Sequence, residues 1–153
     1  GPEGEGEEEE GDGDEEEVTY LLERNVAEYG GANCRAAYLT WGSDAAADFL
    51  KQQQHDGRRK YDLILASQVS YVPSAIPLLV ETMAALLDAQ HGEVLLYNDA
   101  VSVMASQAEC RRILDESLAL HRLAAEVLDV HTWSPDLELP HADAYLMRIR
   151  HAQ

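Results

Sequence analysis

The stretch YDLILASQVSYVPSAIPLLVETMAALL, residues 61–87, sets the expected fold of this 153-residue chain. Its first part, Tyr61 to Ser67, carries apolar residues without alternation, which is typical of a strand covered on both faces. After a short link, Pro73 and Ser74 precede apolar residues at helical spacing, so a helix is predicted from about Ser74 to Ala89. A buried strand followed at once by an amphipathic helix indicates one unit of an α/β fold.

The same alternation of helix and strand extends to both sides of this stretch. A helix between successive strands predicts a mainly parallel sheet with helices on both faces, and two final strands with no helix between them add one antiparallel member. We expect at least four strands, with Tyr61 to Ser67 and Glu93 to Tyr97 adjacent and parallel. The other predicted helices are Val18 to Tyr29, Asp44 to Gln53 and Ser106 to His121, and the other predicted strands are Cys34 to Trp41, Ala124 to Trp133 and Ala144 to Ile149.

The predicted strands place several polar side chains at one edge of the sheet. Open sheets of this type bind ligands outside the carboxyl ends of their strands. Trp41, Ser67 with Gln68, and Tyr97 with Asn98 and Asp99 each follow or close a predicted strand, so we expect them to form one rim. Taken alone, Asn98 and Asp99 are interpreted as turn-forming residues, because both favour turns through local hydrogen bonds.

The acidic charge of the chain is concentrated at its start. Of 29 acidic residues, 11 lie within residues 1–17, so the remainder holds 29 − 11 = 18 acids against 11 basic residues, a net charge of 11 − 18 = −7. The sequence of residues 1–17 has no aromatic or β-branched residue and predicts a disordered acidic segment, either a solubilising tail or surface insertion, or a docking arm for a basic partner. Residues 18–153 are predicted to form one partial α/β domain. The remainder gives no basic face for nucleic acid or for an anionic membrane.

The sequence also limits location and metal chemistry. No window approaches the 18 apolar residues of a membrane span, so we expect an intracellular protein, cytoplasmic or nuclear. Cys34 and Cys110 match no metal-binding or redox spacing and are predicted to be free thiols, interpreted as small buried side chains. The six histidines also lack zinc spacing and are interpreted as surface or linker residues, so no metal site is predicted.

Three motifs carry a resemblance to a known family. LLERNV at residues 21–26, LTWG at residues 39–42 and the stretch at residues 61–87 resemble the class I S-adenosylmethionine-dependent methyltransferases, in particular the small protein-lysine methyltransferases with an Asp-x-x-Tyr motif. The resemblance runs from about Val18 to the end of the chain. It implies a Rossmann-like sheet with an antiparallel last strand, S-adenosylmethionine as cofactor and a protein lysine as substrate.

The resemblance also implies roles for four residues. Trp41 matches the aromatic residue that packs near the adenine, and Ser67 matches the small residue beside the cofactor at the end of the fourth strand. Tyr71 matches the Tyr of the Asp-x-x-Tyr motif and is expected to line the channel for the target amine. Gln68 stands where the family has the Asp of that motif, which removes a negative charge that would attract a lysine ammonium, although its amide can still hydrogen-bond.

The chain departs from the family in one further respect. No predicted strand is followed by the Gly-rich turn that lets the backbone approach the cofactor, or by the acid that binds the ribose. The sequence therefore predicts that the amino-terminal strands of the domain are missing and that this missing half is a partner. Two functions stay open: a methyltransferase acting on a protein lysine, or a non-catalytic methyltransferase-like fragment or binding module.

Overall fold

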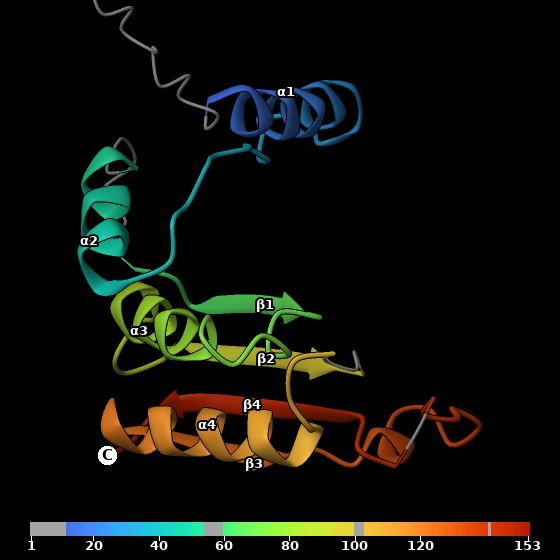
Figure 1. The fold of residues 1–153 in the computed structure, drawn as a ribbon. Coiled ribbons are helices and arrows are strands. Elements are labelled where there is room, and N and C mark those ends of the chain that lie inside the picture. Colours follow the sequence, from blue (N-terminus) through green and yellow to red (C-terminus); the bar gives the residue numbers. More distant parts are fainter. Residues whose placement is uncertain (1–11, 54–59, 100–102, 141) are drawn as a thin grey trace, which may run out of the picture. The chain divides into compact units, whose positions relative to one another are not determined.

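The fold was obtained as a computed structural model, which describes residues 12–53, 60–99, 103–140 and 142–153 (Figure 1). The chain divides into two compact units, Gly1–Leu39 and Thr40–Gln153. We call them the amino-terminal unit and the sheet unit. The division does not coincide with the boundary predicted after residue 17.

The amino-terminal unit contains one long helix, α1, over Asp12–Tyr29. The predicted helix is confirmed, and it begins six residues earlier than predicted, at Asp12. Residues 1–11 of the predicted acidic segment lie outside the described residues. Gly31 has a φ of 66°, a left-handed conformation that glycine adopts without strain just past a helix end.

The strand predicted over Cys34 to Trp41 is wrong. Residues 34–40 are without regular structure, and they are not part of the described sheet. Their apolar and β-favouring residues permit an extended backbone, but a strand also needs a neighbour to form a ladder, and composition alone does not supply one. Cys34 is exposed, contrary to the interpretation of both cysteines as buried, whereas Cys110 is buried, and both are free thiols.

The sheet unit holds a four-stranded mixed sheet in the order β1-β2-β4-β3. Its strands are β1 (Leu63–Ser67), β2 (Glu93–Asn98), β3 (Leu123–Val127) and β4 (Tyr145–His151). β1 and β2 pair in parallel, which confirms the expected adjacency, and β4 pairs antiparallel with both β2 and β3. Three strands therefore run in one direction and the last runs against them, as predicted for a Rossmann-like α/β sheet.

The strand predicted from Ala124 to Trp133 is shorter than expected. β3 ends at Val127, and a 3-10 turn, η2, follows over Val130–Thr132. The Asp129 carboxylate begins this turn by accepting a hydrogen bond of 3.0 Å from the His131 backbone N–H. Capping by an Asp side chain offers the backbone an alternative to the ladder, which apolar patterning does not reveal.

Two helices cover one face of the sheet, and they build the core. α3 (Ile76–Leu86) and α4 (Gln107–Leu120) occupy the positions predicted for them, with slightly shorter ends. Their apolar stripes pack on inward residues of β2 and β4, which alternate with outward ones. The core consists of Ile76, Leu79, Val80, Met83, Leu87, Val94, Leu96, Cys110, Leu114, Leu118, Leu123, Met147 and Ile149.

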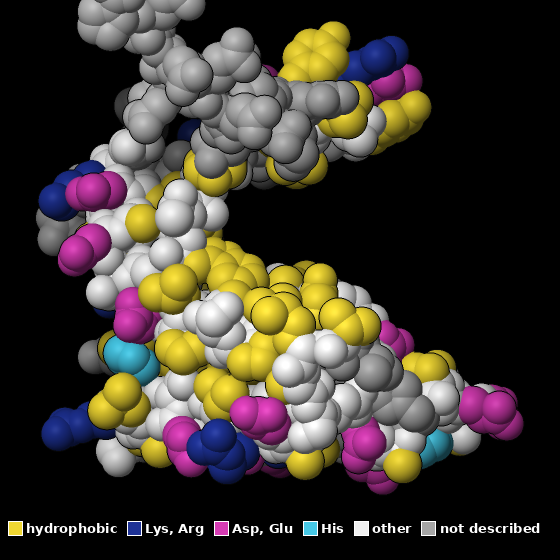
Figure 2. All heavy atoms as spheres, in the orientation of Figure 1, with side chains coloured by type: hydrophobic (Ala, Val, Ile, Leu, Met, Phe, Trp, Pro, Cys, Tyr) yellow, Lys and Arg dark blue, Asp and Glu magenta, His cyan; other side chains and the backbone are white. Residues whose placement is uncertain are grey.

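The opposite face of β1 is not covered by any described helix of the sheet unit. Leu63 and Leu65 lie on this face, with Leu65 73% exposed, and Figure 2 shows hydrophobic side chains gathered over β1. Within the described sheet unit, the prediction that helices cover both faces is therefore wrong. Apolar residues without alternation indicate burial on both faces, but they do not say which element of the chain provides the second cover.

The remaining helix, α2 (Ser43–Gln52), packs on α3. Its N-cap is Gly42, which has no side chain to bind the first backbone N–H groups. Two residues of α3 do so instead: Thr82 Oγ1 accepts from the Gly42 N–H at 2.8 Å, and Glu81 Oε2 accepts from the Ser43 N–H at 3.2 Å. Side chains of one helix thus satisfy donors at the start of the next.

Candidate functional site

The carboxyl ends of β1 and β2 are joined by a cluster of Gln68, Tyr97 and Asp99, here called the strand-end cluster. The Gln68 N–H donates to the Tyr97 carbonyl at 3.0 Å, which extends the parallel ladder one residue beyond β1. Gln68 has a φ of 57°, a left-handed conformation that costs a non-glycine residue free energy. This conformation turns its side chain across to the end of β2.

Side-chain hydrogen bonds fix the Asp99 carboxylate in this cluster. Gln68 Oε1 accepts from the Asp99 N–H at 2.9 Å, and Gln68 Nε2 donates to Asp99 Oδ1. The Tyr97 hydroxyl donates to the second carboxylate oxygen, Oδ2, at 2.8 Å. Both oxygens of Asp99 are therefore held by donors from two strand ends.

The carboxylate affects the ionisation of its neighbour. Burial raises the pKa of the Tyr97 hydroxyl above 10.0, and the hydrogen bond to Asp99 and the negative charge of Asp99 raise it further. Each effect disfavours the tyrosinate, because ionisation would place a second negative charge beside the first. Tyr97 therefore stays a hydrogen-bond donor to Asp99 at neutral pH.

Two expectations about this edge can now be compared with the structure. The predicted rim is confirmed for Gln68, Tyr97 and Asp99. The interpretation of Asn98 and Asp99 as turn-forming residues is wrong, because Asn98 is the last residue of β2 and is buried, and the Asp99 side chain binds across strands. A turn and a strand-end cluster use the same residue types, so local sequence does not distinguish them.

The described contacts do not bring Ser67 and Trp41 together. Ser67 is the last residue of β1, stands opposite Tyr97 in the parallel register and is exposed beside the strand-end cluster. Trp41 packs against the core, and the next residue, Gly42, is bound to α3. No described contact joins Trp41 to Ser67, so its place near an adenine stays a prediction.

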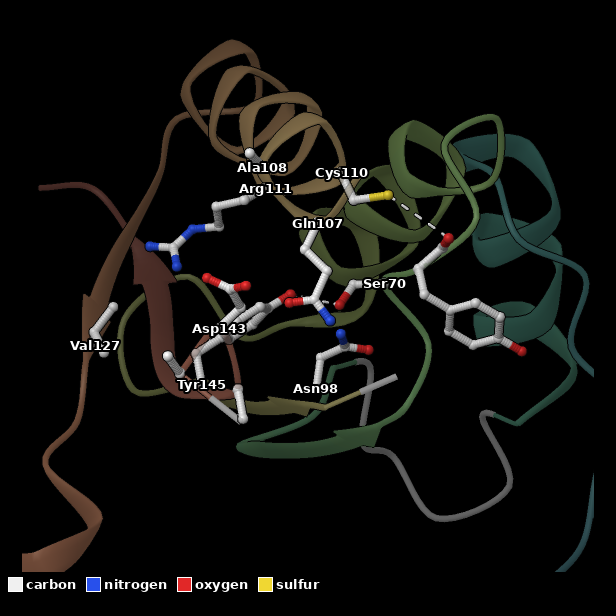
Figure 3. Close-up of a pocket in the computed structure, with 12 residues that line it drawn as sticks. Ser70, Asn98, Gln107, Ala108, Cys110, Arg111, Val127, Asp143 and Tyr145 are labelled. Atoms are coloured by element: carbon white, nitrogen blue, oxygen red, sulfur yellow. Dashed lines mark hydrogen bonds between the residues drawn. The ribbon is translucent and has the colours of Figure 1, made fainter. Parts of the chain in front are cut away.

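A cavity of about 300 Å³ opens at the same end of the sheet, between the start of α4 and the start of β4. Figure 3 shows Gln107, Arg111 and Asp143 converging on it. Tyr71, predicted to line an amine channel, is one of the lining residues and is 37% exposed. Gln68 and Asp99 do not line the cavity, so Tyr71 and Gln68 belong to neighbouring parts of this edge.

The wall of the cavity contains a partly buried hydroxyl pair. Ser70 Oγ and the Tyr145 hydroxyl share a hydrogen bond of 2.6 Å, which ties the link after β1 to the first residue of β4. Burial raises the pKa of Tyr145 above 10.0, although the bond to Ser70 and the positive charge of Arg111 act in the opposite direction. The Arg111 guanidinium lies 5.0 Å from the centre of the Tyr145 ring, within range of a cation–π contact.

Sequence reasoning missed Ser70, Arg111 and Tyr145 as residues of this site. They belong to three elements that are far apart in the chain, and they meet because β4 inserts between β2 and β3. The start of the last predicted strand was visible in the sequence, but its neighbours in the sheet were not. A polar residue at that start is the signal that could have indicated Tyr145.

The described residues fit S-adenosylmethionine only in part. They offer polar groups at strand carboxyl ends, but none of their glycines directly follows the carboxyl end of a strand: Gly30 and Gly31 follow α1, Gly42 precedes α2 and Gly92 precedes β2. A close backbone approach to the cofactor is therefore not provided by the described residues. Neither do they contain a group of three His, Cys, Asp or Glu side chains placed to hold a metal ion.

No helix in the described part of the chain is long and apolar enough to cross a membrane.

Comparison with known proteins agrees with this architecture. A search of curated proteins finds no match. The family model described as lysine methyltransferase matches residues 13–108, which include β1, β2 and the strand-end cluster. Since the match covers more than half of the 153 residues, the chain belongs to the lysine methyltransferase family.

Proposed function

We propose that this protein transfers a methyl group from S-adenosylmethionine to a lysine side chain of a protein substrate. The observation that carries the proposal is the position of the strand-end cluster. It lies within the segment that matches the family and at the carboxyl ends of β1 and β2, where α/β sheets bind their ligands. Membership of the family supports methyl transfer, and the protein-lysine substrate is the further step that we propose.

The chemistry places limited demands on the protein. S-adenosylmethionine supplies an electrophilic methyl group, and the substrate nitrogen must present its lone pair to it. A lysine amine has an unperturbed pKa of about 10.4, so most of it is protonated at neutral pH. The chain contributes by binding the amine and orienting it, which is the largest share of acceleration available without acid–base chemistry.

Tyr71 is the residue that we assign to the wall of the amine channel. It lines the cavity, and its partial exposure allows contact with a bound substrate. Cys110 Sγ, 3.6 Å from the Tyr71 carbonyl oxygen, donates a weak hydrogen bond that holds this part of the link to α4. Exclusion of water from the channel by this wall and the bound substrate would favour the uncharged amine over the ammonium, because desolvation disfavours the charged form.

We further propose that cofactor binding needs a segment with a Gly-rich turn and a ribose-binding acid, in addition to the described residues. The positions of Gly30, Gly31, Gly42 and Gly92 support this proposal, because none directly follows the end of a strand. The segment would be the amino-terminal half of the same domain. The alternative of a degenerate, methyltransferase-like binding module differs in one respect: it predicts no methyl transfer even with that half supplied.

The test compares two proteins: the chain itself, and the chain preceded by a segment from an active member of the family that contains a strand, the Gly-rich turn, a helix and a second strand with its ribose-binding acid. Both are incubated with methyl-labelled S-adenosylmethionine and an array of lysine peptides, with arginine replacing lysine in control peptides. Methyl-lysine found by mass spectrometry supports the proposal. Cofactor binding by the chimera, measured by calorimetry, without methyl-lysine on any peptide would contradict it.

Variants of Tyr71 distinguish a role in lining the amine channel from a role in packing the fold. Tyr71→Ala should reduce methyl transfer by about tenfold or more while the thermal midpoint changes little, since a wall residue positions the substrate. Tyr71→Phe is the matched control, because it keeps the ring and removes only the hydroxyl. The opposite result is that Tyr71→Ala lowers the thermal midpoint strongly while the fraction that stays folded keeps full methyl-transfer activity. In that case Tyr71 packs the fold and does not line a channel.

A further inference from the structure

We propose that Asp143 binds the ammonium group of the substrate lysine where the cavity meets solvent. The inference rests on the proposed function for its biological meaning, but the binding of a lysine side chain can be measured without methyl transfer. It adds a charged group to the cavity that Tyr71 lines, and it names the residue by which this cavity favours a basic side chain.

Asp143 gives the cavity a negative charge at its edge. It is the one carboxylate among the described residues that line the cavity, and it is exposed. Within the described chain it takes part in no hydrogen bond and no ion pair, in contrast to Asp115 and Asp129, whose carboxylates contact Arg111 and His131. A carboxylate that no internal donor holds can form a charge-assisted hydrogen bond with a ligand without losing an existing one.

Arg111 is the one cation among the same lining residues, and it is bound to other partners. Its Nε lies 3.1 Å from Asp115 Oδ1, and its guanidinium lies over the Tyr145 ring. Figure 3 shows Arg111 and Asp143 at the same cavity, but among the described residues no ion pair joins them. Because Asp115 offsets part of the charge of Arg111, the carboxylate of Asp143 keeps its attraction for a cation.

The backbone that carries Asp143 is anchored in the sheet unit. The next residue, Ala144, is only 8% exposed, and Tyr145 begins β4. The Tyr145 hydroxyl is bound to Ser70 Oγ at 2.6 Å, which fixes this end of β4 against the link after β1. Asp143 is therefore held at the cavity although it is exposed, and a ligand that binds there loses less free energy in ordering the chain.

The size and lining of the cavity suit a lysine side chain. A volume of about 300 Å³ is at the lower end of the range for ligand pockets, so the cavity fits one side chain better than a whole cofactor. Ala108 and Val127 line it with apolar groups that can contact the methylene chain. An ammonium held by Asp143 would lie in the cavity to which we assign the amine channel and Tyr71.

The assigned role is recognition of the ammonium rather than proton removal. With an unperturbed pKa of about 10.4, lysine arrives at the cavity mostly as the ammonium, and an exposed carboxylate can bind this form without burying it. The proton then leaves to solvent, and the nitrogen lone pair attacks the methyl group without the help of Asp143. Asp143→Asn should accordingly raise KM much more than it lowers kcat, and the difference in KM should shrink at high salt.

The direct test is a titration of the 153-residue chain with N-acetyl-lysine methylamide at constant ionic strength, followed at the backbone amide of Ala144 by nuclear magnetic resonance. The norleucine analogue, which has the same carbon chain and no ammonium, should bind more weakly. Asp143→Asn should weaken lysine binding about two- to fivefold, the range expected for an ion pair near the surface. Asp136→Asn, an exposed residue that does not line the cavity, should leave it unchanged, and Arg111→Gln should tighten it because a repelling cation is removed.

The outcomes separate this inference from the proposed function. Equal lysine binding by wild type and Asp143→Asn, equal binding of both probes, or the same loss in Asp136→Asn overturns the role of Asp143 even if lysine is methylated. Weaker binding by Arg111→Gln also overturns it, since damage to the cavity would then explain both losses. Lysine binding that depends on Asp143, without methyl transfer by the chimera described above, leaves the site in place and overturns the proposed function. If Asp143→Asn does not fold, Arg111→Gln decides the matter, since the inference requires it to tighten lysine binding.

Discussion

The hydrogen bond between Ser70 and Tyr145 should be a measurable support of the cavity wall. Tyr145→Phe removes the hydroxyl that lies 2.6 Å from Ser70 Oγ and keeps the ring beneath Arg111. Ser70 is only 2% exposed, so its hydroxyl is left without this partner and with little access to water. A buried polar group in that position costs about 1–3 kcal/mol, and we expect the free energy of unfolding to fall by this amount.

The double variant gives the sharper measurement. Ser70→Ala with Tyr145→Phe removes both partners and leaves no buried polar atom unpaired, so its cost should be less than the sum of the two single costs by about 1 kcal/mol. Urea unfolding at pH 7 of the wild type, the two single variants and the double variant completes the cycle. Single-variant losses that simply add would refute the reasoning, since the two hydroxyls would then be independent.

The same pair predicts a dependence on alkaline pH. The pKa of Tyr145 is raised in the folded protein, so the folded state holds this proton more tightly than the unfolded state. Its contribution to stability is complete below the unfolded pKa of about 10 and is lost as the pH rises through the higher folded pKa. Tyr145→Phe should therefore reduce the loss of stability above pH 10, and Tyr97, with its own raised pKa, should account for part of the slope that remains.

Three other results are expected. Thr82→Val should lower the free energy of unfolding by about 1–3 kcal/mol in urea, because the Gly42 N–H loses its acceptor, whereas Thr82→Ser should cost far less; equal losses would contradict this capping. The 153-residue chain should show weak or no heat of S-adenosylmethionine binding in calorimetry, and tight binding would show that a Gly-rich turn is not needed. Leu65→Lys, on the exposed face of β1, should shift the thermal midpoint little, whereas Leu96→Ala in the core should cost about 2–5 kcal/mol; similar midpoints for the two would contradict the assignment of faces.

The sequence predicted which segments of the sheet unit form helices and strands better than it predicted which strands pair with one another. β1 and β2 were predicted because apolar runs bounded by polar links identify strands, and a helix of crossover length places them side by side. The position of β4 between β2 and β3 was not predicted, because it depends on pairing between segments far apart in the chain. The Cys34 to Trp41 segment failed for the same reason: its residues favour an extended backbone, and the partner decides whether a strand forms.

The residues of the candidate site were likewise predicted only in part from the sequence. Gln68 was placed at this edge because it directly follows a recognisable strand, and Tyr71 was assigned through its match to the Tyr of the family's Asp-x-x-Tyr motif. Asp99 was identified as a residue at a strand end but interpreted as turn-forming, since its bonds to Gln68 and Tyr97 depend on a side chain from another strand. Tyr145 was not found at all, because it enters the cavity through the insertion of β4. Residue type and spacing therefore located the edge of the sheet, while the contacts across it came from the fold.

The strand order β1-β2-β4-β3 also affects how the protein is made. During synthesis, β2 and β3 leave the ribosome before β4, yet neither can complete its hydrogen bonds until β4 lies between them. β3 in particular has no other partner in the described sheet, so it stays outside the sheet until the residues of β4 have emerged. Folding before β4 emerges is therefore limited to the pairing of β1 with β2 and the packing of α2 and α4 on α3, and the Ser70–Tyr145 pair forms only in the final step. A nascent chain halted before Tyr145 would expose the edge of β2 to other chains, which makes the last strand the element that ends the period of greatest risk of aggregation.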